Sequence, residues 1–326
     1  MQDSIKKDFG AYIIESHISD TWFKIIMRIL VTGGAGFIGG HLVKSLLENG
    51  DIVTIFDNFS NSSKNLSSLV DTGAKIIEGD ITKLSDITNA VKDHDMVIHL
   101  AAKISVEESI SDPLETFQVN VNGTKNVLIA CKKNNVKKLI AASSAAVYGE
   151  SISGLKLTEE SKMNPISPYG QSKVKMEQEI KEFVSEYKIN YIILRFFNIY
   201  GIGQTLEYSG VITKFLEKIK NNKPLKIFGD GMQTRDFVFI QDVINSIHNA
   251  ISYNKNGIYN IASGKVITIK KLAELMISLS GKKLEIQYSP TKKGDIRYSQ
   301  ADISSAIDNL GYYPRFQLKE GIKALL

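Results

Sequence analysis

Short apolar runs that alternate with stretches of helical periodicity constrain the fold of this chain more than any other feature. The apolar runs cover residues 28–32, 52–56, 75–78, 96–100, 138–142 and 191–194, and the helical patterns cover 37–48, 83–92, 113–133 and 168–187. Continuous apolar strands separated by helices are typical of a parallel sheet that is buried on both faces. The sequence therefore predicts an α/β protein with a doubly wound parallel sheet.

The pattern loosens after residue 195. Helices are predicted at 210–222, 241–253 and 268–280, strands near 225–228, 237–240, 258–261 and 284–288, and two short helical pieces at the end. We interpret residues 28–195 as a Rossmann domain and residues 196–326 as a smaller C-terminal α/β lobe, with 237–262 interleaved into the first domain. Residues 1–27 show no core pattern and are interpreted as an N-terminal extension.

Composition excludes several classes of protein. The 326 residues include 40 Lys and Arg against 35 Asp and Glu, and the basic residues are scattered. A nucleic-acid-binding protein usually gathers them in one stripe, so we expect no nucleic-acid partner. No apolar run approaches about 18 residues, so we expect no membrane span. The single cysteine, Cys131, excludes an intramolecular disulfide. Without a signal-peptide pattern we expect a cytoplasmic protein, and the histidines lack the spacing of metal ligands, so no metal is expected.

A glycine-rich turn joins the first strand to the first helix. The segment TGGAGFIG at 32–39 places Gly33, Gly36 and Gly39 three residues apart. Such glycines allow a tight turn and a close approach of the backbone to a pyrophosphate, which the N–H groups of the following helix then bind. The strand before it and the helix after it supply the required context, so the motif predicts a dinucleotide site.

Acidic residues follow the next two strands. Asp57 ends the second strand, where a carboxylate accepts hydrogen bonds from the adenosine ribose hydroxyls and repels a 2′-phosphate. This favours NAD over NADP. Asp80 and Ile81 follow the third strand, where we expect the adenine, and Asp80 can meet its amino group.

Tyr169 and Lys173 form a Y-x-x-x-K pair at the start of a predicted helix. The spacing i, i+4 places both side chains on one face. An ammonium near a tyrosine, together with an oxidised nicotinamide, favours the phenolate, which is a usable general base toward an alcohol. Ser144, at the end of the fifth strand, can hydrogen-bond the reacting oxygen. The sequence thus predicts a proton-transfer site at the carboxyl ends of the strands.

These motifs carry a family resemblance. They are MRILVTGGAGFIG at 27–39, FDN at 56–58, GDI at 79–81, HLAA at 99–102, NVNGT at 120–124, SSAAVYG at 143–149, YGQSK at 169–173, LRFFNIYG at 194–201, RDFVFIQD at 235–242 and GDIRYSQAD at 294–302. Over residues 28–326 the chain resembles an extended short-chain dehydrogenase/reductase of the NAD-dependent nucleotide-sugar epimerase group, of the UDP-glucose or UDP-N-acetylglucosamine 4-epimerase type.

The resemblance implies a role for individual residues. Tyr169 would be the proton acceptor and donor, Ser144 its partner, and Lys173 the residue that binds the nicotinamide ribose and tunes Tyr169. Cofactor contacts are implied at Gly33, Gly36, Phe37, Ile38, Gly39, Asp57, Asn58, Phe59, Ser60, Asn61, Ser62, Asp80, Ile81, Leu100, Ala101, Ala102, Lys103, Asn120, Tyr169, Lys173 and Phe197. Substrate contacts are implied at Ser144, Asn198, Arg235, Lys292, Asp295 and Ser299.

The resemblance also implies the reaction. Tyr169 would take the proton from the sugar O4 while a hydride passes to NAD, and the 4-keto sugar would turn before the hydride returns to its other face. Related dehydratases carry an Asp-Glu pair directly after the residue that matches Ser144, whereas this chain has Ala145 and Ala146. The expected activity is therefore a UDP-hexose 4-epimerase. Alternatives that remain open are epimerisation of UDP-glucuronate and a non-catalytic NAD-binding sensor on the same fold.

The resemblance also implies which residues contact the substrate and which helices form a dimer. Where Tyr accompanies restriction to UDP-glucose and UDP-galactose, this chain has Ser299, so we expect room for a 2-acetamido group. Lys292 stands where an Arg commonly contacts the diphosphate, and it keeps the charge without the bidentate geometry. Relatives pair through helices that match 113–133 and 168–187, so a homodimer is expected.

Overall fold

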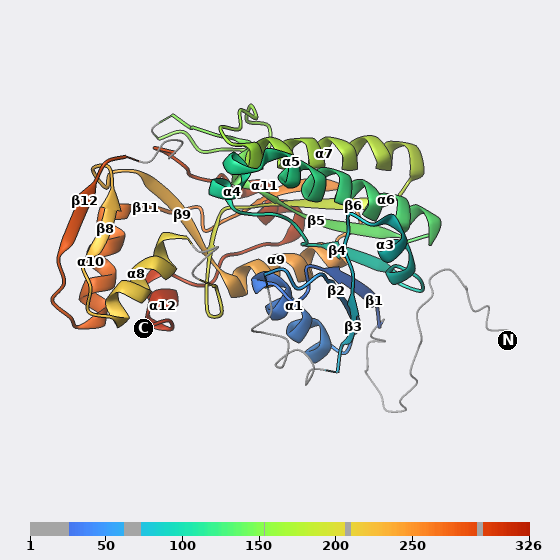
Figure 1. The fold of residues 1–326 in the computed structure, drawn as a ribbon, viewed down its shortest axis with the longest axis horizontal. Helices are drawn as coiled ribbons and strands as arrows, with labels where there is room; N and C mark the ends of the chain where they lie inside the picture. Colours follow the sequence, from blue (N-terminus) through green and yellow to red (C-terminus); the bar gives the residue numbers. More distant parts are fainter. Residues whose placement is uncertain (1–25, 62–72, 153, 206–209, 292–295) are drawn as a thin grey trace.

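A seven-stranded parallel sheet forms the centre of the protein in a computed structural model, which describes residues 26–61, 73–152, 154–205, 210–291 and 296–326 (Figure 1). The strand order is β10-β6-β5-β4-β1-β2-β3, with every neighbouring pair parallel. The strands are β1 (Arg28–Thr32), β2 (Ile52–Asp57), β3 (Lys75–Glu78), β4 (Met96–His99), β5 (Lys138–Ser144), β6 (Asn190–Phe196) and β10 (Gly257–Ile261). The direction of winding reverses between β1 and β4, which confirms the doubly wound fold.

Helices cover both faces of this sheet. On one face lie α1 (Phe37–Glu48) and α9 (Ile240–Ser252), and on the other α3 (Leu84–Ala90), α6 (Thr124–Lys133) and α7 (Pro168–Tyr187) (Figure 1). Successive residues of β1 alternate between the two cores, because side chains of a strand point to opposite faces. Ile29 and Val31 join the first core, whereas Leu30 joins the second. This is why the strands read as continuous apolar runs.

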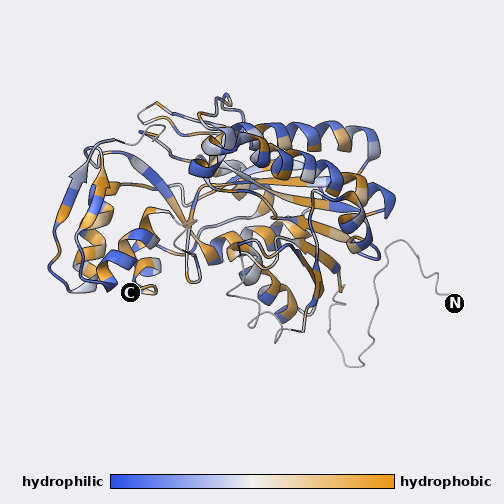
Figure 2. Cartoon of the chain, viewed as in Figure 1, coloured by the Kyte–Doolittle hydropathy of each residue, from blue (hydrophilic) through white to orange (hydrophobic). Residues whose placement is uncertain are grey.

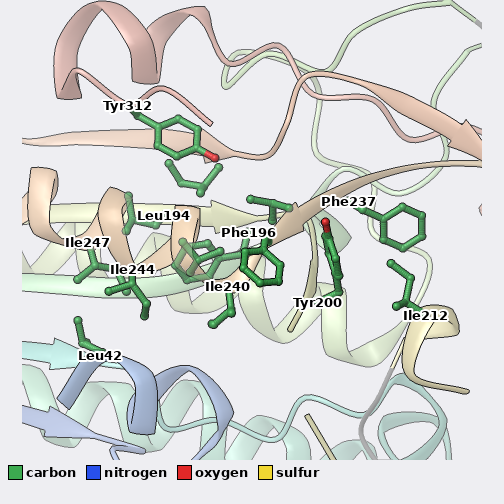
Figure 3. Packing of buried hydrophobic residues seen from close by; sticks show 14 of the residues in the cluster. Leu42, Leu194, Phe196, Tyr200, Ile212, Phe237, Ile240, Ile244, Ile247 and Tyr312 are labelled. Atoms are coloured by element: carbon green, nitrogen blue, oxygen red, sulfur yellow. The ribbon is translucent and has the colours of Figure 1, made fainter. Parts of the chain in front are cut away.

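The first core extends beyond the sheet. Figure 3 shows Leu42 of α1 and Ile244 and Ile247 of α9 beside Leu194 of β6. Figure 2 shows hydrophobic residues on the strands and on the helix faces toward them, with hydrophilic residues outside. Among the described residues, no helix is both long and apolar enough to cross a membrane.

The helix expected at 113–133 is interrupted. It consists of α5 (Pro113–Phe117), a π-helical stretch at Gln118–Gly123 and α6, and a short helix, α4 (Val106–Ser111), precedes it. The wider turn contains Asn120, whose side chain leaves the helix to bond to the backbone of Lys103. A tertiary contact therefore decides the backbone geometry where the local pattern indicates a regular helix.

A second group of elements lies at one end of the sheet (Figure 1). A three-stranded sheet has the order β11-β9-β7, and a two-stranded sheet pairs β12 with β8. The elements are β7 (Asn198–Tyr200), β8 (Leu225–Phe228), β9 (Thr234–Phe239), β11 (Val266–Thr268), β12 (Ile286–Ser289), α8 (Val211–Lys220), α10 (Ile269–Ser280) and α12 (Leu318–Lys323). The helix α11 (Ser304–Leu310) packs instead against β10 and α9 of the main sheet. Within the segment 237–262, α9 and β10 belong with the main sheet, whereas β9 does not. The division into a Rossmann domain and a substrate lobe remains a prediction.

Candidate active site

The turn between β1 and α1 leaves no room for side chains at two of its glycines. Gly33 has φ +69°, and a Cβ there would lie 2.7 Å from the backbone nitrogen of Ala101. A Cβ on Gly39 would lie 2.3 Å from the carbonyl oxygen of Gly33. The glycines thus bring the start of α1 against the turn and against the segment that follows β4. The first N–H groups of α1 open onto this turn, as a pyrophosphate site requires.

Asp57 organises the neighbouring strand end. Its carboxylate accepts hydrogen bonds from the backbone N–H groups of Ala35, at 3.0 Å, and of Phe59, at 2.9 Å. It therefore joins the glycine-rich turn to the loop after β2. In that loop the side-chain oxygen of Asn58 accepts hydrogen bonds from the backbone N–H of Ser60, at 3.2 Å, and from its hydroxyl, at 2.9 Å. The loop runs on to Asn61, and the expected contact Ser62 lies outside the described residues.

Asp80 occupies the same edge of the sheet after β3. Its carboxylate accepts two hydrogen bonds of 2.8 Å from the backbone and the hydroxyl of Thr82. Burial acts to raise the pKa of this carboxyl, but the bonds from Thr82 and from Asn58 outweigh it, so the pKa lies below its ordinary value. Ile81 is buried, and Gly123 of the π-helical stretch packs directly on it. The acidic and apolar residues predicted for the adenosine thus meet at one strand edge.

Asn120 connects the cofactor segment to the helix with Tyr169. Its amide oxygen accepts from the backbone N–H of Lys103, and its amide nitrogen donates to the Lys103 carbonyl and to the Ser172 hydroxyl, all at 2.8–2.9 Å. The side chain is 1% exposed. It fixes the path of Leu100, Ala101, Ala102 and Lys103 after β4. Lys103 also forms a 3.1 Å ion pair with Glu115.

Tyr169 and Lys173 lie one turn apart at the start of α7. The Ser167 hydroxyl caps this helix by accepting from the backbone N–H of Gly170. Both side chains are buried, and Tyr169 forms a hydrogen bond with Ser144 at the end of β5. Lys173 Nζ donates to the carbonyl of Ala142 at 2.9 Å. The structure therefore brings the three predicted catalytic residues together across β5 and α7.

Burial dominates the electrostatics of this pair. Burial raises the pKa of the Tyr169 hydroxyl, and the bond with Ser144 lowers it only in part. Burial lowers the pKa of Lys173 to about 8, while the Glu177 carboxylate acts in the opposite direction. The Lys173 ammonium donates to the carbonyl of Ala142 at 2.9 Å. The protein groups alone do not lower the pKa of Tyr169.

A cavity of about 820 Å³ opens beside the pair. Ser144 and Tyr169 line one part of it, with Phe197, Asn198 and Arg235 nearby in the lining. Asn198 donates to the Asp236 carbonyl at 2.9 Å, and Arg235 donates to its neighbour's carbonyl, that of Thr234. Ser299 is buried at 6% exposure and does not occur among the described residues that line the cavity. Lys292 and Asp295 lie outside the described residues.

Sequence reasoning missed several residues that line the cavity. Lys214, Lys218 and Lys226 come from α8 and β8, and Glu107 comes from α4. The spacing of Lys214 and Lys218 places them on one helix face. Nothing local to the sequence indicates that this face borders a cavity shared with Tyr169, because their meeting depends on how the second group of elements packs.

Comparisons with known proteins agree with this geometry. Residues 29–262 match the model of the NAD dependent epimerase/dehydratase family. A UDP-glucose 4-epimerase of Thermotoga maritima, solved with UDP-glucose, is 36% identical with a TM-score of 0.87 and covers 91% of this chain and 96% of its own. A UDP-N-acetylglucosamine 4-epimerase of Methanobrevibacter ruminantium, in complex with UDP-N-acetylmuramic acid, has 36% identity, a TM-score of 0.86 and the same coverage. A UDP-glucuronic acid 4-epimerase of Bacillus cereus, with UDP-glucuronic acid and NAD, has 33% identity and a TM-score of 0.86, and covers 91% and 97%.

Proposed function

Because the chain belongs to the NAD dependent epimerase/dehydratase family and is an NAD-dependent nucleotide-sugar 4-epimerase, we propose that it interconverts UDP-glucose and UDP-galactose, and also UDP-N-acetylglucosamine and UDP-N-acetylgalactosamine. One observation carries the proposal. The buried hydrogen-bonded pair of Tyr169 and Ser144 faces a cavity that also holds Asn198 and Arg235. A proton-transfer group and a cation suited to a diphosphate thus share one space.

The residues present fit NAD. Neighbouring backbone blocks the Cβ positions of Gly33 and Gly39, so only glycine allows the tight turn and helix start that bind a pyrophosphate in dinucleotide sites. Asp57 stands at the end of β2, where an adenosine ribose would lie, and Asp80 and Ile81 stand at the end of β3. When bound, NAD supplies the hydride acceptor and donor. The chain's own residues provide position and proton transfer.

Proton transfer at the sugar O4 is the role of Tyr169. Its phenolate removes the O4 proton as the sugar is oxidised at C4, and the hydroxyl formed in this way returns the proton as the 4-keto sugar is reduced. Ser144 holds the reacting oxygen and the Tyr169 hydroxyl in one hydrogen-bonded set. Lys173 places a positive charge behind Tyr169, beside the strand end. Ala145 and Ala146 offer no acid or base for loss of water, which supports epimerisation without dehydration.

The cavity is lined by charges of both signs. Its described lining includes the carboxylates of Glu107 and Glu217 and the cations Lys214, Lys218, Lys226 and Arg235. The cations suit the diphosphate that every UDP-sugar carries, so these charges do not select between a neutral sugar and a uronate. Likeness to a UDP-glucuronic acid 4-epimerase keeps that reaction as the second candidate.

Assembly as a cytoplasmic homodimer is part of the proposal. Three apolar side chains are exposed on α4 and α5 beside α7, namely Val106 at 42%, Ile110 at 60% and Leu114 at 84%. Adjacent exposed apolar side chains mark surfaces that bind proteins. A second copy that presents the same face would cover them by two-fold symmetry.

Substrate conversion tests the proposal. The purified protein is incubated separately with UDP-glucose, UDP-N-acetylglucosamine and UDP-glucuronate, and NMR of the anomeric protons identifies the products. The proposal expects the first two to be converted to their 4-epimers. Conversion of UDP-glucuronate alone would select the second candidate, and no conversion of any of them with NAD present would overturn both.

A further inference from the structure

A buried ion pair lies directly behind the catalytic residues. Glu177 follows Lys173 by one helical turn and Tyr169 by two, so the three side chains share one face of α7. Its partner is Arg195 of β6, and the two residues are 0% and 1% exposed. Nothing in the proton-transfer chemistry above uses either residue.

Both carboxylate oxygens of Glu177 accept hydrogen bonds. Arg195 Nε donates to Glu177 Oε1 at 2.9 Å, and Nη2 donates to Oε2 at 2.7 Å, which is a bidentate fork. The hydroxyl of Ser143 donates to Oε1 at 2.5 Å. Both oxygens of Glu177 are therefore held, one of them by the residue next to Ser144.

Arg195 is anchored in turn. Its Nη1 donates to the Tyr148 hydroxyl at 2.9 Å and to the Glu159 carbonyl at 3.0 Å. The Tyr148 hydroxyl donates to Asn260 of β10 at 2.6 Å. The carboxylate of Glu177 is thus held in one position by contacts that reach β5, β6 and β10.

Stability alone is a weak reason for such a pair, because well-packed apolar residues of similar volume often replace buried ion pairs without loss. Its place suggests another reason. Lys173 is 3% exposed and its Nζ donates to Ala142, two residues before Ser144. Glu177 thus lies one helical turn from Lys173 and is bonded to the strand through Ser143.

We propose that Glu177 is a positioning residue for proton transfer: clamped by Arg195, its carboxylate keeps the buried Lys173 charged and holds the strand end with Ser144 against α7. This inference rests on the proposed roles of Tyr169 and Lys173. The other titratable groups that face Lys173 are Tyr169 on α7 and His99 on β4. Burial, together with the charge on Lys173, lowers the pKa of His99 to about 3, so the imidazole is neutral and adds no charge.

Charge-changing variants give the proposal a specific test. Glu177→Gln removes the negative charge, whereas Arg195→Met removes the positive charge and leaves Glu177 facing Lys173. We expect the alkaline limb of the kcat–pH profile of the holoenzyme to move down by about one pH unit in Glu177→Gln. In Arg195→Met it should stay in place or move up. If the ion pair served only the structure, the alkaline limb of the kcat–pH profile would move in the same direction in both variants.

A second readout does not depend on turnover. The holoenzyme is labelled with 13C at lysine Cε and studied by NMR. The signal of Lys173 is identified as the one that is missing from the spectrum of Lys173→Arg. Its titration should move to lower pH in Glu177→Gln and not in Glu186→Gln, which neutralises an exposed carboxylate on the same helix. A shifted titration without conversion of any UDP-sugar would retain this inference and overturn the proposed function.

Equal shifts in Glu177→Gln and Arg195→Met, or an unmoved Lys173 titration in Glu177→Gln, would overturn the proposal. If Glu177→Gln does not fold, the Lys173 titration in Arg195→Met tests the proposal by itself. A Lys173 titration that moves to lower pH in Arg195→Met then contradicts the proposed charge relationship, and one that stays or moves up supports it.

Discussion

Gly39 packs so closely on Gly33 that a Cβ on Gly39 would lie 2.3 Å from the Gly33 carbonyl oxygen. Gly40, the next residue of α1, has no neighbour within 4 Å of its Cβ position. We expect Gly39→Ala to lower the free energy of unfolding by at least about 1–3 kcal/mol and to abolish the thermal stabilisation by NAD. Gly40→Ala is the matched control and should gain about 0.5–1 kcal/mol, since alanine favours the helix. Thermal unfolding with and without NAD measures both, and equal behaviour of the two variants would contradict a pyrophosphate site at this turn.

Removal of the Tyr169 hydroxyl should disable catalysis without loss of the fold. We expect Tyr169→Phe to lower kcat by about 10²- to 10⁴-fold, the usual worth of a positioned proton-transfer group. NAD should still bind. Tyr187→Phe, at the far end of the same helix, should keep the parent kcat. Full activity of Tyr169→Phe would assign proton transfer to another group.

Ser299 tests the size of the sugar site. In Ser299→Tyr we expect UDP-glucose turnover to persist while kcat/KM for UDP-N-acetylglucosamine falls by at least about 10-fold. Ser304→Tyr, at an exposed position, controls for the added ring. Because Ser299 is buried and outside the described cavity lining, equal losses on both sugars would mean that it acts through packing alone.

Leu114 tests the dimer. A charge at this 84% exposed side chain cannot be buried without a large desolvation cost. Leu114→Glu should therefore be monomeric in size-exclusion chromatography with light scattering, at concentrations where the parent is a dimer. Tyr313→Glu changes a 63% exposed residue elsewhere and should leave the dimer intact. A dimeric Leu114→Glu would move the interface to another face.

Cys131 reports unfolding. It is the only cysteine of the chain and is 0% exposed. Burial raises the pKa of its thiol to about 12, so the reactive thiolate is absent at pH 8. Iodoacetamide should leave the native protein unmodified and add one group per chain in denaturant, as read by mass spectrometry. Rapid modification of the native protein would show that α6 opens.

Much of the fold was predictable because its signals are local. The apolar runs marked the strands of the main sheet, since each strand is buried on both faces. The break in the helix at Asn120 was not predictable, because it depends on a bond to Lys103, 17 residues away in the chain. The strand β7 was missed for a similar reason: its three residues are a strand only because β9 lies beside them.

The sequence by itself determined the doubly wound sheet, the glycine turn and the Tyr169–Lys173 pair, because strand burial, turn geometry and helical spacing are properties of neighbouring residues. Only the tertiary structure decided what surrounds the pair. Arg195 and Glu177 meet because β6 packs on α7, and Lys214 reaches the cavity because α8 faces it from the second group of elements. A buried charge acts through distance and desolvation, and packing sets both.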